Sequence, residues 1–136
     1  MKEQLVSFET AVLAKEKGFN VETLHFYCKN RTCDYIKTPY KYSFEVNANQ
    51  ERLINGEIDN FGYGITWSAP TQSLLQRWLD ITYNKYVHVE KHTKNGLKCY
   101  SPFIDNIPVK EAFFNDYDKS EEALEKGLQE ALKLIK

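Results

Sequence analysis

The sequence lacks the features of a membrane protein, a secreted protein or a disordered chain. No apolar run approaches the ~20 residues that a membrane-spanning helix needs. The opening stretch MKEQLVSFETAVLAKEKG contains Glu3 and Glu9 and has no apolar core of a signal peptide. Low-complexity stretches and linkers are also missing. We therefore expect a folded cytoplasmic protein that does not bind membranes.

Cysteine is scarce, and neither sign of charge is in excess. The three cysteines, Cys28, Cys33 and Cys99, are an odd number, which without a secretion signal favours reduced thiols. The 18 basic residues are balanced by 19 acidic residues, so the net charge is −1. This balance provides no general attraction to a polyanion, and it disfavours nucleic acid as a partner.

Familiar motifs of catalysis are missing as well. The chain contains no GxSxG, GxxxxGK, GxGxxG or HExxH pattern. The stretch FGYGITW contains a GxG, but the third glycine of a dinucleotide-binding motif is absent. We therefore expect no cofactor, and the sequence favours a protein that is not an enzyme.

What the sequence does contain is enough apolar material for a core. A length of 136 residues fits one domain, and a hydrophobic content of 42% argues against disorder. Helical and strand patterns follow one another along the chain. They predict a single α+β domain over residues 1–136, with a mostly antiparallel sheet, helices packed on one side, and the order α-β-β-β-α-β-β-α.

Three segments have the apolar period of a helix: Ser7–Lys17, Ser68–Asn84, and a third that begins near Asp118–Ser120. Ser7 is a suitable N-cap for the first helix, and Gly18 is a suitable residue to end it. The third helix has a cap candidate in Asp118 or Ser120.

The middle helix is the best defined of the three. We expect its polar residues, Gln72 among them, to face water, and its apolar face to consist of Leu74, Leu75, Trp78, Leu79 and Thr82. In the third helix, Gly127 falls on the apolar side, where a glycine costs about 1 kcal/mol relative to alanine. Close packing against another element is the reason we expect for this glycine.

Five segments are predicted as strands: Thr23–Cys28, Tyr40–Val46, Phe61–Trp67, Tyr86–His92 and Leu97–Ile104. The second and third alternate clearly, and we expect them to pair as antiparallel neighbours. Asn95-Gly96 predicts a tight hairpin turn between the last two. Pro102 indicates that the last strand is an edge strand or ends there.

Three stretches carry a resemblance: SFETAVLAKEKGFN, APTQSLLQRWL and SEEALEKGLQEALKLIK. With them the chain resembles a family of short uncharacterised proteins of Bacteroides-type bacteria and their phages. The middle stretch is the most specific of the three. The resemblance implies an intracellular protein of phage or mobile-element origin, and it brings no activity and no catalytic residues.

Residues 71–136 also have a topological likeness to a double-stranded-RNA-binding domain, since they run helix, hairpin, loop, helix. Such a domain needs a basic patch at its second helix to hold phosphates. Here that helix opens with Ser120, Glu121 and Glu122, whose carboxylates would repel phosphate. A nucleic-acid-binding domain is therefore an alternative that the sequence disfavours.

His25, Cys28 and Cys33 have the best spacing for metal ligands. Zinc requires four ligands, usually from two close pairs, and a CxxC pair is missing. The simpler interpretation is a surface histidine, a buried cysteine and a loop cysteine. We expect no bound metal.

His88, Glu90 and His92 alternate along a predicted strand, so they share one face. Such a row could run acid–base chemistry, and it is the only basis for the alternative that the protein is an enzyme. A solvated strand face produces the same row without a function, and the sequence favours that interpretation.

Aromatic residues are unusually abundant, with nine Tyr, eight Phe and two Trp. Tyr and Trp are favoured where proteins meet, although a sheet core can also account for them. We predict that Tyr40, Tyr42, Tyr63 and Trp67 belong to a surface that binds another protein or a second copy of this chain. The sequence thus favours a small non-catalytic binding protein, and a phage accessory factor in particular.

Overall fold

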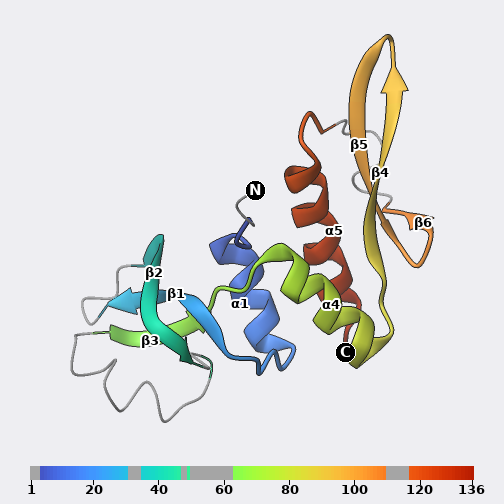
Figure 1. Ribbon diagram of the computed structural model, residues 1–136. Coiled ribbons are helices and arrows are strands. Elements are labelled where there is room, and N and C mark those ends of the chain that lie inside the picture. The colour runs from blue at the N-terminus through green and yellow to red at the C-terminus, as the bar shows by residue number, and fades with distance from the viewer. Residues whose placement is uncertain (1–3, 31–34, 47–48, 50–62, 110–116) are drawn as a thin grey trace. The chain divides into compact units, whose positions relative to one another are not determined.

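The structure is a computed structural model, which describes residues 4–30, 35–46, 49, 63–109 and 117–136. Within these residues lie three α-helices and two antiparallel three-stranded sheets. The predicted α+β class and the order of elements are confirmed, but the strands form two sheets instead of one. The chain divides into two compact units, residues 5–70 and residues 71–136 with 1–4 (Figure 1).

Within the described residues, the first unit contains one helix and one sheet: α1 (Phe8–Glu16), β1 (Thr23–Asn30), β2 (Tyr35–Val46) and β3 (Tyr63–Ser68). Its strand order is β2-β1-β3. The predicted pairing of β2 with β3 is therefore wrong, because each pairs with β1. The reason lies in β1, where Phe26, Tyr27 and Cys28 are all buried. A strand covered on both faces does not alternate, and its central place is hard to recognise.

Helix α1 begins and ends as the sequence predicts. The Ser7 Oγ atom accepts a hydrogen bond from the Thr10 backbone N–H at 3.3 Å. Gly18 has φ 91°, and the next amide, that of Phe19, donates to the Ala14 carbonyl at 2.9 Å. The Phe19 ring is buried, as expected for the apolar residue that follows such a C-cap.

Aromatic rings form part of the core of the first unit. Phe8 lies edge-on to Tyr27, with ring centroids 5.6 Å apart, and edge-on to Trp67 at 5.2 Å. The Tyr27 hydroxyl donates to the Val6 carbonyl at 2.6 Å. Some of the abundant aromatic residues are therefore accounted for by the core of this unit.

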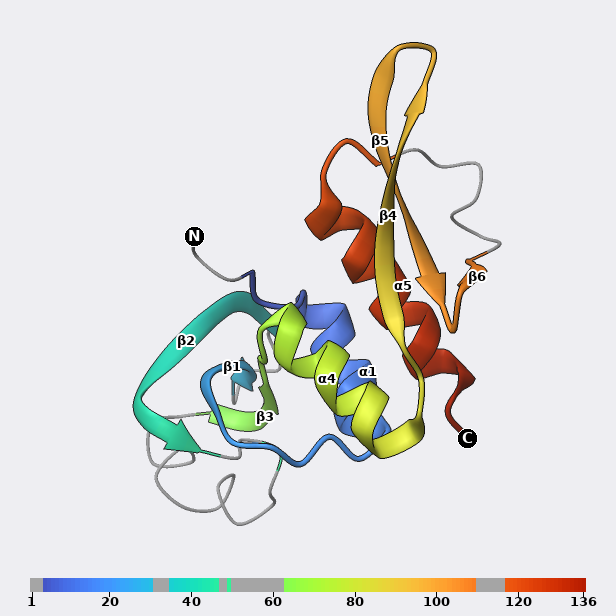
Figure 2. The same ribbon diagram turned by 45° about the vertical axis from the view of Figure 1, so that its right-hand side comes forward.

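The second unit has the order α4 (Gln72–Tyr83), β4 (Val87–Lys94), β5 (Leu97–Ile104), β6 (Ile107–Pro108) and α5 (Ser120–Leu134). Its sheet has the strand order β4-β5-β6. Helix α5 lies along the β4–β5 hairpin, and the tip of the hairpin extends beyond the first turn of the helix (Figures 1 and 2). The turn is the one predicted, with φ 53° at Asn95 and 80° at Gly96.

The buried face of α4 differs from the predicted one. Leu75 and Leu79 are fully buried, but Leu74 and Trp78 are half-buried and Thr82 is exposed. Gln72, which we expected to face water, is buried instead. Its Nε2 atom donates to the Glu121 carbonyl at 2.9 Å and to the Glu125 Oε1 atom at 3.0 Å. The amide is therefore satisfied by partners on α5.

Strand β5 continues past Pro102 and has a neighbour on each side, so it is not an edge strand. The Pro102 carbonyl accepts from the Val109 amide at 3.1 Å. In a strand, the nitrogen and the carbonyl of one residue point to the same side. The missing N–H of Pro102 therefore faces away from β4, and the ladder to β4 loses nothing.

Helix α5 presents the predicted apolar stripe, with Ala123, Leu128, Ala131 and Leu132 fully buried. Its start differs from the prediction. The N-cap residue is Lys119, and none of the described side chains forms a capping hydrogen bond with the helix.

Candidate functional site

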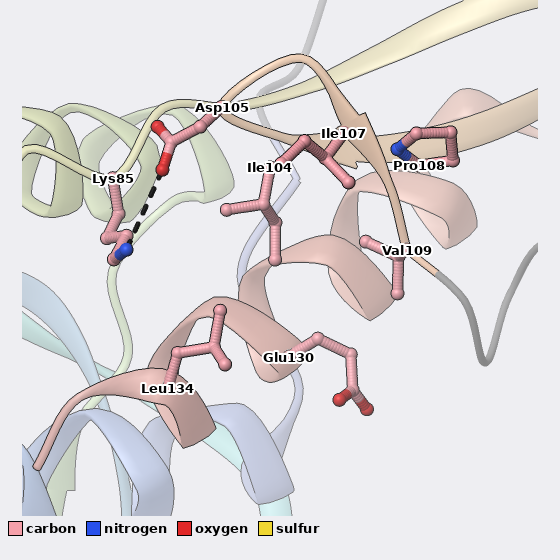
Figure 3. Close-up of a pocket in the computed structure, with 8 residues that line it drawn as sticks. All are labelled: Lys85, Ile104, Asp105, Ile107, Pro108, Val109, Glu130 and Leu134. Atoms are coloured by element: carbon pink, nitrogen blue, oxygen red, sulfur yellow. Dashed lines mark ion pairs between the residues drawn. The ribbon is translucent and has the colours of Figure 1, made fainter.

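A pocket of about 320 Å³ lies in the second unit, between the β5–β6 turn and the C-terminal half of α5 (Figure 3). Most of its lining is aliphatic: Ile104, Ile107, Pro108, Val109 and Leu134. Two of these side chains are well exposed, Ile107 at 65% and Leu134 at 56%. The apolar surface therefore continues from the pocket onto its rim.

Three charged residues complete the lining, and each of them is paired. The Lys85 ammonium lies 3.7 Å from an Asp105 carboxylate oxygen, an ion pair visible across one end of the pocket in Figure 3. Glu130 accepts from Lys126 at 3.0 Å and from Lys133 at 3.2 Å. Ion pairs that solvent can reach contribute little to stability, but these leave no charged group of the lining without a partner.

The pocket exists because the chain turns sharply between β5 and β6. Asp105 and Asn106 have φ 53° and 67°, a region that Asp and Asn tolerate better than most residues. Asp105 also closes the base of the hairpin: its amide donates to the Tyr86 carbonyl at 2.8 Å, and its Oδ1 atom accepts from the Tyr86 amide at 2.9 Å. Asp105-Asn106 was the signal that could have revealed the turn.

The His88, Glu90 and His92 row lies on β4, as predicted, and is brought together only in part. The His88 Nε2 atom lies 3.2 Å from Glu90 Oε2. The imidazole is stacked with Tyr86 and with Phe103, with ring centroids 5.1 Å and 5.2 Å apart. Its Nδ1 atom is buried and has no partner in the described part of the chain. An imidazole packed against two rings and bonded to a neighbouring carboxylate favours a structural role over proton transfer to a substrate.

Of the candidate metal ligands, His25 and Cys28 both lie on β1, and Cys33 lies outside the described residues. Burial raises the pKa of the Cys28 thiol, which disfavours the thiolate that zinc requires. Burial, and then the charge of Lys41, lower the pKa of His25. Among the described residues, no three His, Cys, Asp or Glu side chains come close enough to hold a metal ion.

The aromatic residues predicted to bind a partner fall into two groups. Trp67 is buried, at 8% exposure, and belongs to the core of the first unit. The side chains of Tyr40, Tyr42 and Tyr63 lie outside the part of the chain that the structure describes. An aromatic binding surface in the first unit stays a prediction, and the exposed apolar pocket of the second unit was not anticipated.

Comparison with known proteins gives no match. Neither a family model, nor a curated protein, nor a solved structure is similar to this chain. In the described ranges, no helix has both the length and the apolar character needed to cross a membrane.

Proposed function

We propose that this protein is a non-catalytic binding protein, and that its pocket receives an apolar side chain from another protein. One observation carries the proposal: the lining is aliphatic and partly exposed, whereas its charged groups are already paired. The resemblance to proteins of bacteria and their phages makes a bacterial host protein the proposed partner.

Because the charged groups of the lining are paired, a protein is favoured over a small polar molecule as the ligand. Small-molecule sites orient their ligand with a few convergent polar groups that are free to bind it. Here Lys85 is paired with Asp105, and Glu130 is paired with two lysines. What the pocket offers is therefore apolar area with a polar surround, which is the arrangement found at the centre of protein interfaces.

The exposed rim supports the same partner. A pocket of about 320 Å³ is at the small end of the range for ligand sites, and it suits one or two side chains. Ile107 and Leu134 line the edge of the pocket and are largely exposed, so a small molecule inside it would leave much of their apolar surface in water. A protein segment would cover both, and burial of apolar surface stabilises such a complex by about 25 cal/mol per Å² before the costs of association.

Site-specific photocrosslinking tests the proposal. A benzophenone amino acid replaces Leu134 at the rim in one variant and Ile81 on α4 in a control, since Ile81 is also exposed, at 71%. In cells of a Bacteroides-type bacterium, the host that the resemblance proposes, we expect one discrete adduct from position 134 and none from position 81. Ile107→Asp should abolish the adduct while the thermal unfolding midpoint is unchanged.

Three outcomes would contradict the proposal. The first is the absence of any adduct, and the second is equal adducts from both positions. The third is an adduct with twice the mass of the chain, which would show self-association at this pocket instead of a host partner.

A further inference from the structure

Strand β4 lies at one end of the strand order β4-β5-β6, so β5 pairs with only one of its two sides. The β4–β5 hairpin extends beyond the first turn of α5 in both views (Figures 1 and 2). The other side of β4 is therefore an edge of the sheet, and its backbone groups need partners from elsewhere.

The hydrogen bonds of β5 show which residues of β4 face this edge. Tyr100, which is opposite Lys91, donates its backbone N–H to the Tyr117 carbonyl at 3.0 Å and so turns away from β4. In an antiparallel pair, opposite residues either bond to each other or both turn outward. Lys91 therefore directs its own N–H and C=O to the edge. Val89 and Thr93 do the same, because they lie two residues to either side of it.

The outward groups of these three residues are open. Val89, Lys91 and Thr93 have no hydrogen bond on the outer side of β4 in the part of the chain that the structure describes. The edge is closed only at its base, where the Val87 carbonyl accepts from the Gln76 Nε2 atom of α4. Three successive outward N–H and C=O groups are a template for one more strand.

A second copy of β4 fills this template completely in one antiparallel register. A two-fold axis at Lys91 pairs this residue with its own copy, and pairs Val89 with Thr93 of the second copy. All three open residues are then used. The next register toward the base would need the Val87 carbonyl, which is occupied. The next register toward the tip would pair Val89 with Asn95, which lies in the turn.

The charges along β4 favour the same register. It places Glu90 opposite His92 of the second copy in a narrow pair, with about 4.5 Å between Cα atoms, where the carboxylate can accept from the imidazole. Both side chains are exposed. Lys91 meets its copy in a wide pair, at about 5.5 Å, and its long exposed side chain can diverge. The register nearer the base would instead place Glu90 opposite Glu90.

From the open edge, its single complete register and this charge pattern, we infer that the protein forms a symmetric dimer through β4. The two three-stranded sheets join edge to edge into one continuous sheet. The contact uses residues 89–93 and none of the residues that line the pocket, so neither proposal depends on the other.

Sedimentation equilibrium of the full chain, over about 1–200 µM, tests the inference, because a dimer forms in a concentration-dependent way. Lys91→Pro removes the outward N–H and leaves the ladder to β5 intact, so the variant should fold and associate at least about tenfold more weakly. Lys91→Thr keeps the N–H and removes the pair of like charges on the axis. It should associate about two- to fivefold more tightly than the wild type. Lys136→Thr is the matched control for charge, and its association should equal that of the wild type.

Hydrogen exchange locates the contact, because the amides of Val89, Lys91 and Thr93 should become protected as the wild type associates. Circular dichroism and the thermal midpoint establish that each variant is folded. Three results would overturn the inference: a wild type that stays monomeric over the whole range, a folded Lys91→Pro chain that associates as the wild type does, and a dimer that Ile107→Asp abolishes. The last result would place the contact at the pocket.

Discussion

Gly127 of α5 packs against Val87 of β4 so closely that a methyl group at Gly127 would lie 2.9 Å from the Val87 Cγ1 atom. The Pro102 Cβ atom would be 3.0 Å from the same methyl group. This contact confirms the close packing that the sequence predicted for a glycine in the middle of a helix. It also fixes how near the helix can approach the sheet of its unit.

The first prediction follows from this contact. Gly127→Ala gains about 1 kcal/mol of helix propensity, but overpacking costs about 1–3 kcal/mol. Val87 is β-branched and Pro102 is a ring, so neither can move its methyl or methylene group easily. We expect a net loss in the free energy of unfolding, measured with urea, and a smaller loss in a Val87→Ala background. A Gly127→Ala chain more stable than the wild type would show that the contact is looser than described.

The second prediction tests the buried face of α4. Leu79 is fully buried and Thr82 is exposed, although the sequence placed both on one apolar face. Leu79→Ala should lower the free energy of unfolding by about 2–5 kcal/mol, because it leaves a cavity. Thr82→Ala should change it by less than about 0.5 kcal/mol. Similar losses in the two variants would restore the face that the sequence predicted.

The third prediction concerns the buried amide of Gln72, which links α4 to α5 through Glu121 and Glu125. Gln72→Ala removes both hydrogen bonds, and we expect a loss of about 1–2 kcal/mol in the free energy of unfolding. Glu125→Gln keeps a neutral acceptor in place, so its loss should be smaller. If Gln72→Ala has no effect, the amide is exposed in solution.

The fourth prediction is a pH dependence at His25. Burial and the charge of Lys41 lower the pKa of His25 in the folded state. As pH falls below about 6.5, the unfolded chain binds the proton first, so stability decreases until the pH reaches the folded pKa. His25→Gln removes this pH-dependent contribution to stability. Its thermal midpoint should therefore fall less than that of the wild type between about pH 7 and pH 5, and identical curves would contradict the burial of this imidazole.

The sequence predicted those features whose causes are local. Ser7 and Gly18 bound α1 because their capping interactions reach only a few residues along the chain. Asn95-Gly96 forms the hairpin turn because both residues accept positive φ. The close packing at Gly127 is predictable because glycine destabilises the middle of a helix unless the lack of a side chain serves the packing.

The remaining features depend on partners that are distant in the sequence. Strand β1 is central because β2 and β3 both pair with it. The residues of β1 have no periodicity that would indicate this central position. Gln72 is buried only because α5 offers it two acceptors. The pocket arises where Asp105 and Asn106 turn the chain beside Leu134, and the sequence does not indicate that these residues meet.

The central claim is that the pocket binds an apolar part of another protein. Calorimetry tests it most directly, with the partner segment that crosslinking identifies as the titrant. Burial of apolar surface predicts a negative heat-capacity change on binding. We expect this change in the wild type and no detectable binding in Ile107→Asp or Leu134→Asp, with binding retained in Ile81→Asp. A heat-capacity change near zero, or equal binding by all three variants, would contradict the account.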